Sequence, residues 1–100
     1  MGIFIVTFRI YDDAGYADRY QSVVEQIKKC CHDGIFWDQT TSFFVLKNPS
    51  TAEKIAEYID ANSTFSPTRD LLVVIALSQK DHAVIGNITD TDLHKLMALR

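Results

Sequence analysis

Asp12 and Asp13 are the first residues of this sequence whose type and spacing could support chemistry. They stand side by side after an apolar segment, and carboxylate oxygens are the ligands that hard divalent cations such as Mg²⁺ prefer. The same pair is typical of a solvated turn before a helix, because acidic groups stabilise the positive end of the helix dipole. Two interpretations therefore stay open, a metal-binding or catalytic pair and an ordinary turn.

A second group combines two thiols and an imidazole, in the order Cys30, Cys31 and His32. Two adjacent thiols and one histidine provide too few well-spaced ligands for a structural zinc site. Neighbours in one helix also rarely reach disulfide geometry. We therefore expect reduced, partly buried thiols near a helix end, in a reducing compartment. The isolated His82 and His94 indicate no chemistry of their own.

The composition limits the possible functions. The chain has 100 residues, of which 47% are hydrophobic and 23% are charged, and this is typical of one globular domain. Its formal net charge is −3, whereas sequence-independent nucleic-acid binders carry an excess of Lys and Arg. Any nucleic-acid contact must then use a local basic patch or a metal ion. Since neither a signal peptide nor a membrane span is evident, we expect a cytoplasmic protein without a membrane partner.

Hydrophobic periodicity predicts the elements that must position these residues. We expect four main strands and two main helices: strands over residues 3–10, 35–37, 42–47 and 71–77, and helices over 16–31 and 51–61. Ser50-Thr51-Ala52-Glu53 resembles a capping box that opens the second helix. A short strand over 82–88 and a short helix opened by Thr89 and Asp92 should follow.

This order of elements predicts an α+β fold, a ferredoxin-like βαββαβ sandwich with a short C-terminal strand and helix. We expect one domain over residues 1–100, with its core in 3–77 and a C-terminal extension over 78–100. On the first helix, the spacing places Tyr16 and Tyr20 on the inward face and Arg19 on the solvated face. The residues that we expect in the core are Phe4, Val6, Phe8, Val24, Ile27, Phe44, Ile55, Ile59 and Val74.

The second face of the predicted sheet is also largely apolar. Two helices cover only one face, while Ile3, Ile5 and alternate residues of the strand over 71–77 point to the other, which therefore needs a cover. A second copy of the protein is the simplest cover, with Ile3, Ile5 and Thr7 in the interface of a homodimer. The alternative is that the C-terminal extension folds back over its own chain.

Five short motifs resemble one known group. They are Ile5-Val6-Thr7-Phe8-Arg9-Ile10, Thr41-Ser42-Phe43-Phe44-Val45, Thr51-Ala52-Glu53-Lys54-Ile55, Asp70-Leu71-Leu72-Val73 and Ala83-Val84-Ile85-Gly86. Over residues 3 to 88 the chain resembles the small CRISPR-associated protein two and its relatives, the virulence-associated protein D toxins. The resemblance implies a ferredoxin-like homodimer. In some members two acidic residues hold a divalent metal for phosphodiester cleavage, and others bind duplex DNA without catalysis.

This sequence departs from that group at the end of the first strand. The group has Tyr-Asp-Ile or Tyr-Asp-Leu where this chain has Phe8-Arg9-Ile10. Arg9 offers no lone pair to a metal, and it attracts phosphate or carboxylate. We therefore expect a non-catalytic homodimeric scaffold or binding protein without a metal or cofactor, in which Arg9 contacts an anion on nucleic acid or a protein partner. The alternative is a nuclease or ribonuclease toxin that uses Mg²⁺ or Mn²⁺ on Asp12 and Asp13.

Overall fold

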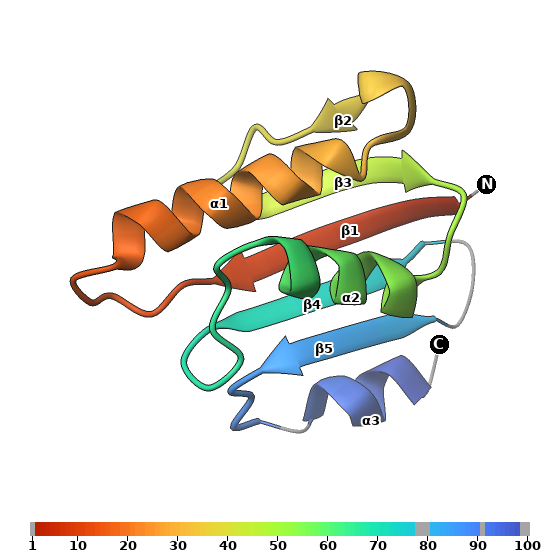
Figure 1. The fold of residues 1–100 in the computed structure, drawn as a ribbon. Helices are drawn as coiled ribbons and strands as arrows, with labels where there is room; N and C mark the ends of the chain where they lie inside the picture. Colours follow the sequence, from red (N-terminus) through yellow and green to blue (C-terminus); the bar gives the residue numbers. More distant parts are fainter. Residues whose placement is uncertain (1, 78–80, 91, 99–100) are drawn as a thin grey trace.

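The computed structural model describes residues 2–77, 81–90 and 92–98, which form an α+β fold (Figure 1). Its strands are β1 (Gly2–Arg9), β2 (Phe36–Trp37), β3 (Phe43–Asn48), β4 (Leu71–Ala76) and β5 (His82–Gly86). Its helices are α1 (Tyr16–Lys29), the 3₁₀ turn η1 (His32–Gly34), α2 (Ala52–Asn62) and α3 (Asp92–Ala98). In this part of the chain, no helix has both the length and the hydrophobicity that are needed to cross a bilayer.

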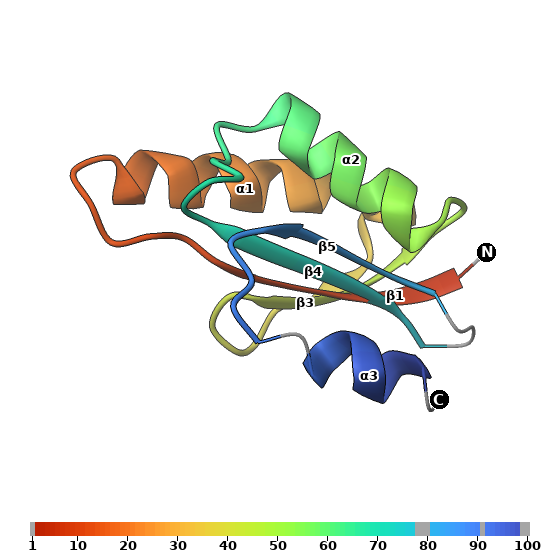
Figure 2. The ribbon, with the colours of Figure 1, turned by 90° about the horizontal axis from the view of Figure 1, so that it is seen from below.

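The described strands form one open sheet in the order β2-β3-β1-β4-β5, and all neighbouring strands are antiparallel. β1 occupies the centre, since Val6 lies opposite Phe44 of β3 on one side and Val74 of β4 on the other. Helices α1 and α2 cover one face of the sheet, whereas α3 lies on the opposite side (Figure 2). The end of β1 therefore lies between two neighbouring strands and the loop that leads to α1.

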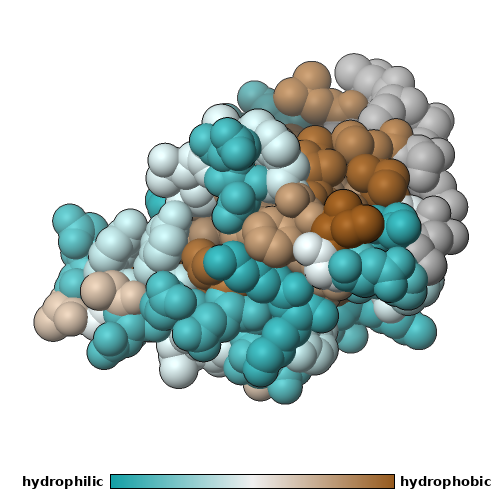
Figure 3. Space-filling view, turned by 90° about the horizontal axis from the view of Figure 1, so that it is seen from above, coloured by the Kyte–Doolittle hydropathy of each residue, from teal (hydrophilic) through white to brown (hydrophobic). Residues whose placement is uncertain are grey.

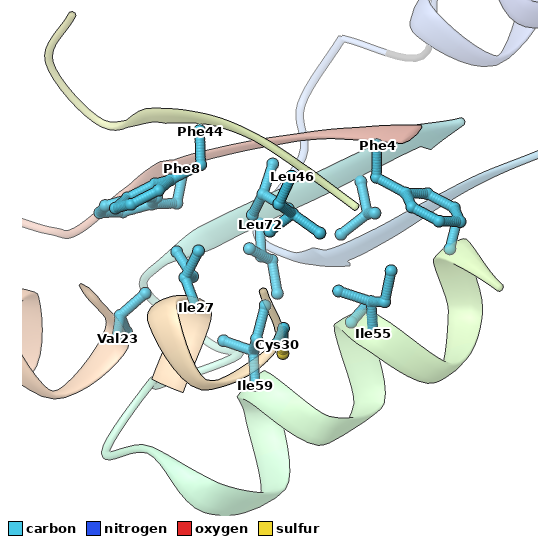
Figure 4. Close-up of a cluster of buried hydrophobic side chains, with 14 of the residues drawn as sticks. Phe4, Phe8, Val23, Ile27, Cys30, Phe44, Leu46, Ile55, Ile59 and Leu72 are labelled. Atoms are coloured by element: carbon cyan, nitrogen blue, oxygen red, sulfur yellow. The ribbon is translucent and has the colours of Figure 1, made fainter. Parts of the chain in front are cut away.

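The core fills the space between the sheet and the two long helices (Figure 4). Alternation on β1 turns Phe4, Val6 and Phe8 toward α1 and α2, because successive side chains of a strand point to opposite faces. The expected core is confirmed: its members are buried, apart from Val24, which is partly buried and packs against the others. Burial of such side chains is the main stabilising contribution to a domain of this size.

The second face of the sheet is covered only in part. α3 runs beside β5, where His82 Nε2 and His94 Nδ1 lie 3.0 Å apart. The C-terminal extension thus folds back against its own chain, since β5 pairs with β4 and α3 lies on the second face beside β5 (Figure 2). On the other half of the face, Ile3 of β1 is 39% exposed and Trp37 of β2 is 44% exposed. An apolar surface over β2, β3 and β1 therefore remains in contact with solvent.

The N-cap that the sequence predicts for α2 is wrong by one residue. The N-cap of α2 is Thr51, whose Oγ1 accepts the Lys54 N–H at 3.2 Å. Ser50 lies outside the helix because its N–H donates to Asn48 Oδ1 at 2.7 Å and closes a turn. At the start of α3, Asp90 and not Thr89 provides the local contact, since Asp90 Oδ1 accepts the Asp92 N–H at 2.9 Å.

The connection from β2 to β3 ends at Ser42, which has a φ of 55°. The Ser42 carbonyl oxygen accepts the Phe8 N–H at 3.2 Å and the Thr7 hydroxyl at 3.0 Å. Thr7 therefore bonds within its own chain, and it lies on the same face of β1 as Ile3 and Ile5. These contacts fix the far end of β1, where Arg9 follows.

Candidate functional site

A buried ion pair lies at the end of β1. Arg19 on α1 and Asp70, the residue before β4, are 7% and 0% exposed. Arg19 Nε donates to Asp70 Oδ2 at 3.0 Å, and Arg19 Nη2 donates to Asp70 Oδ1 at 3.2 Å. This two-pronged contact orients both planar groups, because the guanidinium and the carboxylate match in geometry. The pair thereby connects the first turns of α1 with the start of β4.

The same pair fixes the path of the chain after β1. Asp70 Oδ1 accepts the Tyr11 N–H at 2.7 Å, and Asp70 Oδ2 accepts the Ser66 N–H at 2.9 Å. Arg19 Nη2 also donates to the Tyr11 carbonyl oxygen at 3.0 Å. Both main-chain polar groups of Tyr11 are therefore held by the buried pair, as buried polar groups need partners.

Asp13 extends this cluster toward the surface. Its Oδ1 accepts Arg19 Nη1 at 2.8 Å and the Gly15 N–H at 2.9 Å. Its Oδ2 accepts Arg69 Nη1 at 2.8 Å. The carboxylate of Asp13 thus lies between two guanidinium groups, one buried and one exposed.

The protonation states of the cluster follow from these contacts. The hydrogen bond from Arg19 holds the pKa of Asp13 below its ordinary value. Burial by itself would raise the pKa of Asp70, but the hydrogen bonds from Arg19, Tyr11 and Ser66 lower it. The hydrogen bonds to Asp70 and Asp13 raise the pKa of Arg19. The cluster is therefore ionised at neutral pH.

A hollow of about 520 Å³ opens beside this cluster, at the ends of β1 and β5. Its lining is Arg9, Ile10, Tyr11, Asp12, Thr68, Arg69, Asn87 and Thr89. Two guanidinium groups, three hydroxyl groups and an amide give it many hydrogen-bond donors, beside the single carboxylate of Asp12. Such a set suits an anion or a polar ligand that carries one. We call it the Arg9 hollow.

Arg9 itself is exposed, and its Nη2 donates to the Asn87 carbonyl oxygen at 3.5 Å. Within the described residues, Arg9 forms no ion pair with a carboxylate. The nearby carboxylates of Asp13 and Asp70 bind Arg19 and Arg69 instead. The remaining donors of the Arg9 guanidinium can therefore bind an anion from outside.

The structure brings Arg9 and Asp12 to one hollow and places Asp13 beside it. Asp12 is exposed, whereas both oxygens of Asp13 already accept hydrogen bonds from guanidinium groups. A divalent cation needs several free oxygen ligands and is repelled by nearby arginines. The carboxylates of Asp12 and Asp13 in this arrangement therefore do not suit Mg²⁺ or Mn²⁺. Over residues 2–77, 81–90 and 92–98, no three His, Cys, Asp or Glu side chains gather to hold an ion.

The buried position of Arg19 contradicts the prediction from helical spacing that this residue lies on the solvated face of the first helix. Arg19 stands four residues before Val23 and eight before Ile27, so it belongs to the buried stripe of α1. Asp70 compensates its charge there. The spacing was a usable signal for Arg19, whereas Asp70 carried only a weak one, an acidic residue directly before an apolar strand.

The two thiols are inert parts of the core. Cys30 and Cys31 are buried and free. Burial raises the pKa of Cys30 to about 12 and that of Cys31 to about 11. Because the thiolate is the reactive form, neither side chain is a nucleophile at neutral pH.

Comparison with known proteins finds no match: no protein-family model, curated protein or solved structure is significantly similar to this chain. The resemblance to the CRISPR-associated protein two group therefore rests on the five short motifs alone, and it stays a hypothesis.

Proposed function

We propose that the protein is a non-catalytic homodimeric binding protein that contacts nucleic acid through the Arg9 hollow. One observation carries the proposal: Arg9, at the end of the central strand, has no carboxylate partner among the described residues and lies in a hollow with Arg69. Exposed guanidinium groups bind phosphate oxygens with good geometry. The buried Arg19–Asp70 pair holds both main-chain polar groups of Tyr11, which lines this hollow.

The topology agrees with this proposal. The order β2-β3-β1-β4, with α1 and α2 on one face, supports a ferredoxin-like interpretation of residues 3–77. β5 then extends the sheet beyond β4, and α3 belongs to the C-terminal extension. Since one fold serves many functions, the fold alone does not carry the proposal.

The homodimer is supported by the apolar surface over β2, β3 and β1. Ile3, Trp37 and Val45 contribute to a hollow of about 280 Å³ in this region. Figure 3, which views the molecule from the edge that carries β2, shows hydrophobic side chains gathered at the upper right. Contiguous exposed apolar surface marks interaction sites, and two-fold homodimers are the most frequent assemblies. Ile3, Ile5 and Thr7 would lie in the interface.

We expect the protein in the cytoplasm, because its buried free thiols suit a reducing compartment. No cofactor enters the proposal.

Binding to short labelled oligonucleotides, measured by fluorescence anisotropy over a range of salt concentrations, tests the proposal. We expect the affinity to fall with salt, and the log–log salt slope of Arg9→Ala to be smaller than that of the wild type by about 1. Lys54→Ala is the matched control, since it removes an exposed cation of α2 that lies outside the Arg9 hollow. A wild type that binds no nucleic acid would contradict the proposal.

A cleavage assay separates this function from the nuclease alternative. We expect no cleavage of RNA or DNA by the wild type in Mg²⁺ or Mn²⁺. Turnover that requires metal and is abolished by Asp12→Asn would establish the nuclease instead. Cleavage by Asp13→Asn is measured as well. A circular dichroism spectrum must show that this variant is folded, because Asp13 also holds Arg19 and Arg69.

A further inference from the structure

We infer that the Arg9 hollow takes an unpaired nucleotide, whose base stacks on Tyr11 while Arg9 and Arg69 bind the flanking phosphates. The protein should therefore prefer single-stranded over duplex nucleic acid. The inference rests on the proposed function and specifies the ligand of the same site.

Tyr11 combines a fixed main chain with an exposed side chain. Its N–H and carbonyl oxygen are held by Asp70 and Arg19 at 2.7 and 3.0 Å, yet the residue is 54% exposed. A buried ion pair thus serves to hold an aromatic residue that contributes nothing to the core. An exposed ring on a rigid main chain is a suitable stacking platform, because little conformational freedom remains to be lost on binding.

The other tyrosines near α1 have structural contacts. The rings of Tyr16 and Tyr20 lie 5.7 Å apart, and Tyr20 also contacts Phe8 at 5.3 Å. In the described part of the chain, the ring of Tyr11 has no such aromatic partner. Tyr11 is therefore the aromatic residue of this region whose ring is available to a ligand.

Arg69 supplies the second cation. Its Nη1 is anchored on Asp13 Oδ2 at 2.8 Å, while its side chain is 52% exposed. A guanidinium has five N–H donors, so the contact with Asp13 leaves others for a phosphate oxygen. Asp13 is a positioning residue in this arrangement, because it orients Arg69 without touching the ligand.

The geometry of the hollow favours an unpaired strand. A hollow of about 520 Å³ is within the usual range for a small-molecule site, and one nucleotide is a ligand of that class. In a duplex the base faces are covered by their neighbours, so that a base reaches Tyr11 only after unpairing and unstacking. Phosphate contacts alone do not distinguish the two forms, whereas stacking on Tyr11 does.

The experiment compares one labelled single strand with the duplex that it forms with its complement. The variants are Tyr11→Leu, which removes the ring, and Tyr11→Phe, which keeps it. Tyr58→Leu is the control, since Tyr58 is a 39% exposed tyrosine on α2 outside the Arg9 hollow. We expect the wild type, Tyr11→Phe and Tyr58→Leu to bind the single strand about tenfold more tightly than the duplex, and Tyr11→Leu to lose this difference.

The outcomes separate this inference from the function on which it rests. Equal affinity for strand and duplex, or wild-type selectivity in Tyr11→Leu, overturns the inference, while a weaker affinity of Arg9→Ala would still support the proposed function. No binding of either form by the wild type overturns both. Loss of single-strand binding in Arg69→Ala, with an unchanged circular dichroism spectrum, supports the second phosphate contact, and wild-type affinity in that variant contradicts it.

Discussion

Four hydrogen bonds converge on the carboxylate of Asp70, which has no exposed surface. Two come from Arg19 and two from main-chain N–H groups of Tyr11 and Ser66. Removal of this carboxylate would leave buried donors without an acceptor and a buried cation without its main partner. At the scale of single residues, the shape of the Arg9 hollow therefore depends on a side chain that lies outside its lining.

The pH dependence of stability tests this cluster. The folded-state pKa values of Asp13 and Asp70 lie below the 3.8 that is ordinary for aspartate. As the pH falls, the two carboxylates therefore take up protons first in the unfolded chain. The stability that their ion pairs contribute is complete at pH values above the ordinary pKa, and it is lost as the pH falls toward the lower pKa values of the folded state. We expect the urea midpoint to be nearly constant from about pH 7 to 5 and to fall below about pH 4.

Two substitutions sharpen the measurement. Asp13→Asn should have a lower urea midpoint than the wild type at pH 7 and a smaller fall in acid. Asp12→Asn should keep the full fall, because this exposed carboxylate has no ion-pair partner among the described residues. The interpretation fails if the acid-induced fall in Asp13→Asn is as large as in the wild type.

At the scale of elements, Gly86 permits the close approach of β5 to the start of β4. Its φ is +121°, and a Cβ atom at this position would lie 1.9 Å from the Asp70 carbonyl oxygen. That oxygen accepts the Asn87 N–H at 2.9 Å, so the approach is part of the pairing of the two strands. The glycine therefore links the edge strand to the residue that organises the Arg9 hollow.

Gly86→Ala should destabilise the protein strongly, and Gly34→Ala is its matched control. Both glycines have positive φ, but nothing lies within 4 Å of a Cβ atom at Gly34. Gly34→Ala should then lower the free energy of unfolding by only about 1–2 kcal/mol, which is the cost of a left-handed conformation for a residue with a Cβ atom. Gly86→Ala adds the clash with the main chain and should lower the free energy of unfolding by more. Equal midpoints of the two variants in urea would show that β5 adapts to the added methyl group.

The element types were predictable from the sequence, because hydrophobic periodicity reports which faces are buried. β4 is apolar on both faces, as a strand between α2 and a partly covered second face requires. The features that the sequence did not predict depend on contacts between residues that are distant along the chain. Asp81, at the turn before β5, accepts the Ala52 N–H at 2.8 Å and so contributes to the start of α2. In the same way, no local pattern reveals that Asp13 binds Arg69.

At the scale of the molecule, the sequence allowed two alternatives for what packs on the second face of the sheet, the C-terminal extension or a second copy of the protein. α3 provides one along β5, and the second copy stays a prediction for the surface over β2, β3 and β1. Hydrophobic patterning indicates that such a face needs a cover, but it does not distinguish a segment of the same chain from a partner chain.

Sedimentation velocity tests the homodimer. We expect the wild type to sediment as a dimer and Ile3→Glu or Ile5→Glu to shift it to monomer, since two buried glutamates would face each other near the two-fold axis. Tyr58→Glu is the control, because it introduces the same charge on an exposed residue of α2. A wild type that is monomeric at the highest accessible concentration would remove the dimer from the proposal.

The central position of β1 has a consequence for synthesis of the protein. Val6 pairs across the sheet with Phe44 and Val74, so β1 leaves the ribosome well before either neighbouring strand exists. Its apolar residues can pack only after distant parts of the chain have been synthesised, and folds with such non-local contacts form slowly. A nascent chain that stalls before β4 would expose one side of β1 as an unpaired, hydrophobic edge, which is a site of aggregation. Folding of this chain should therefore be completed late, after β4 has emerged.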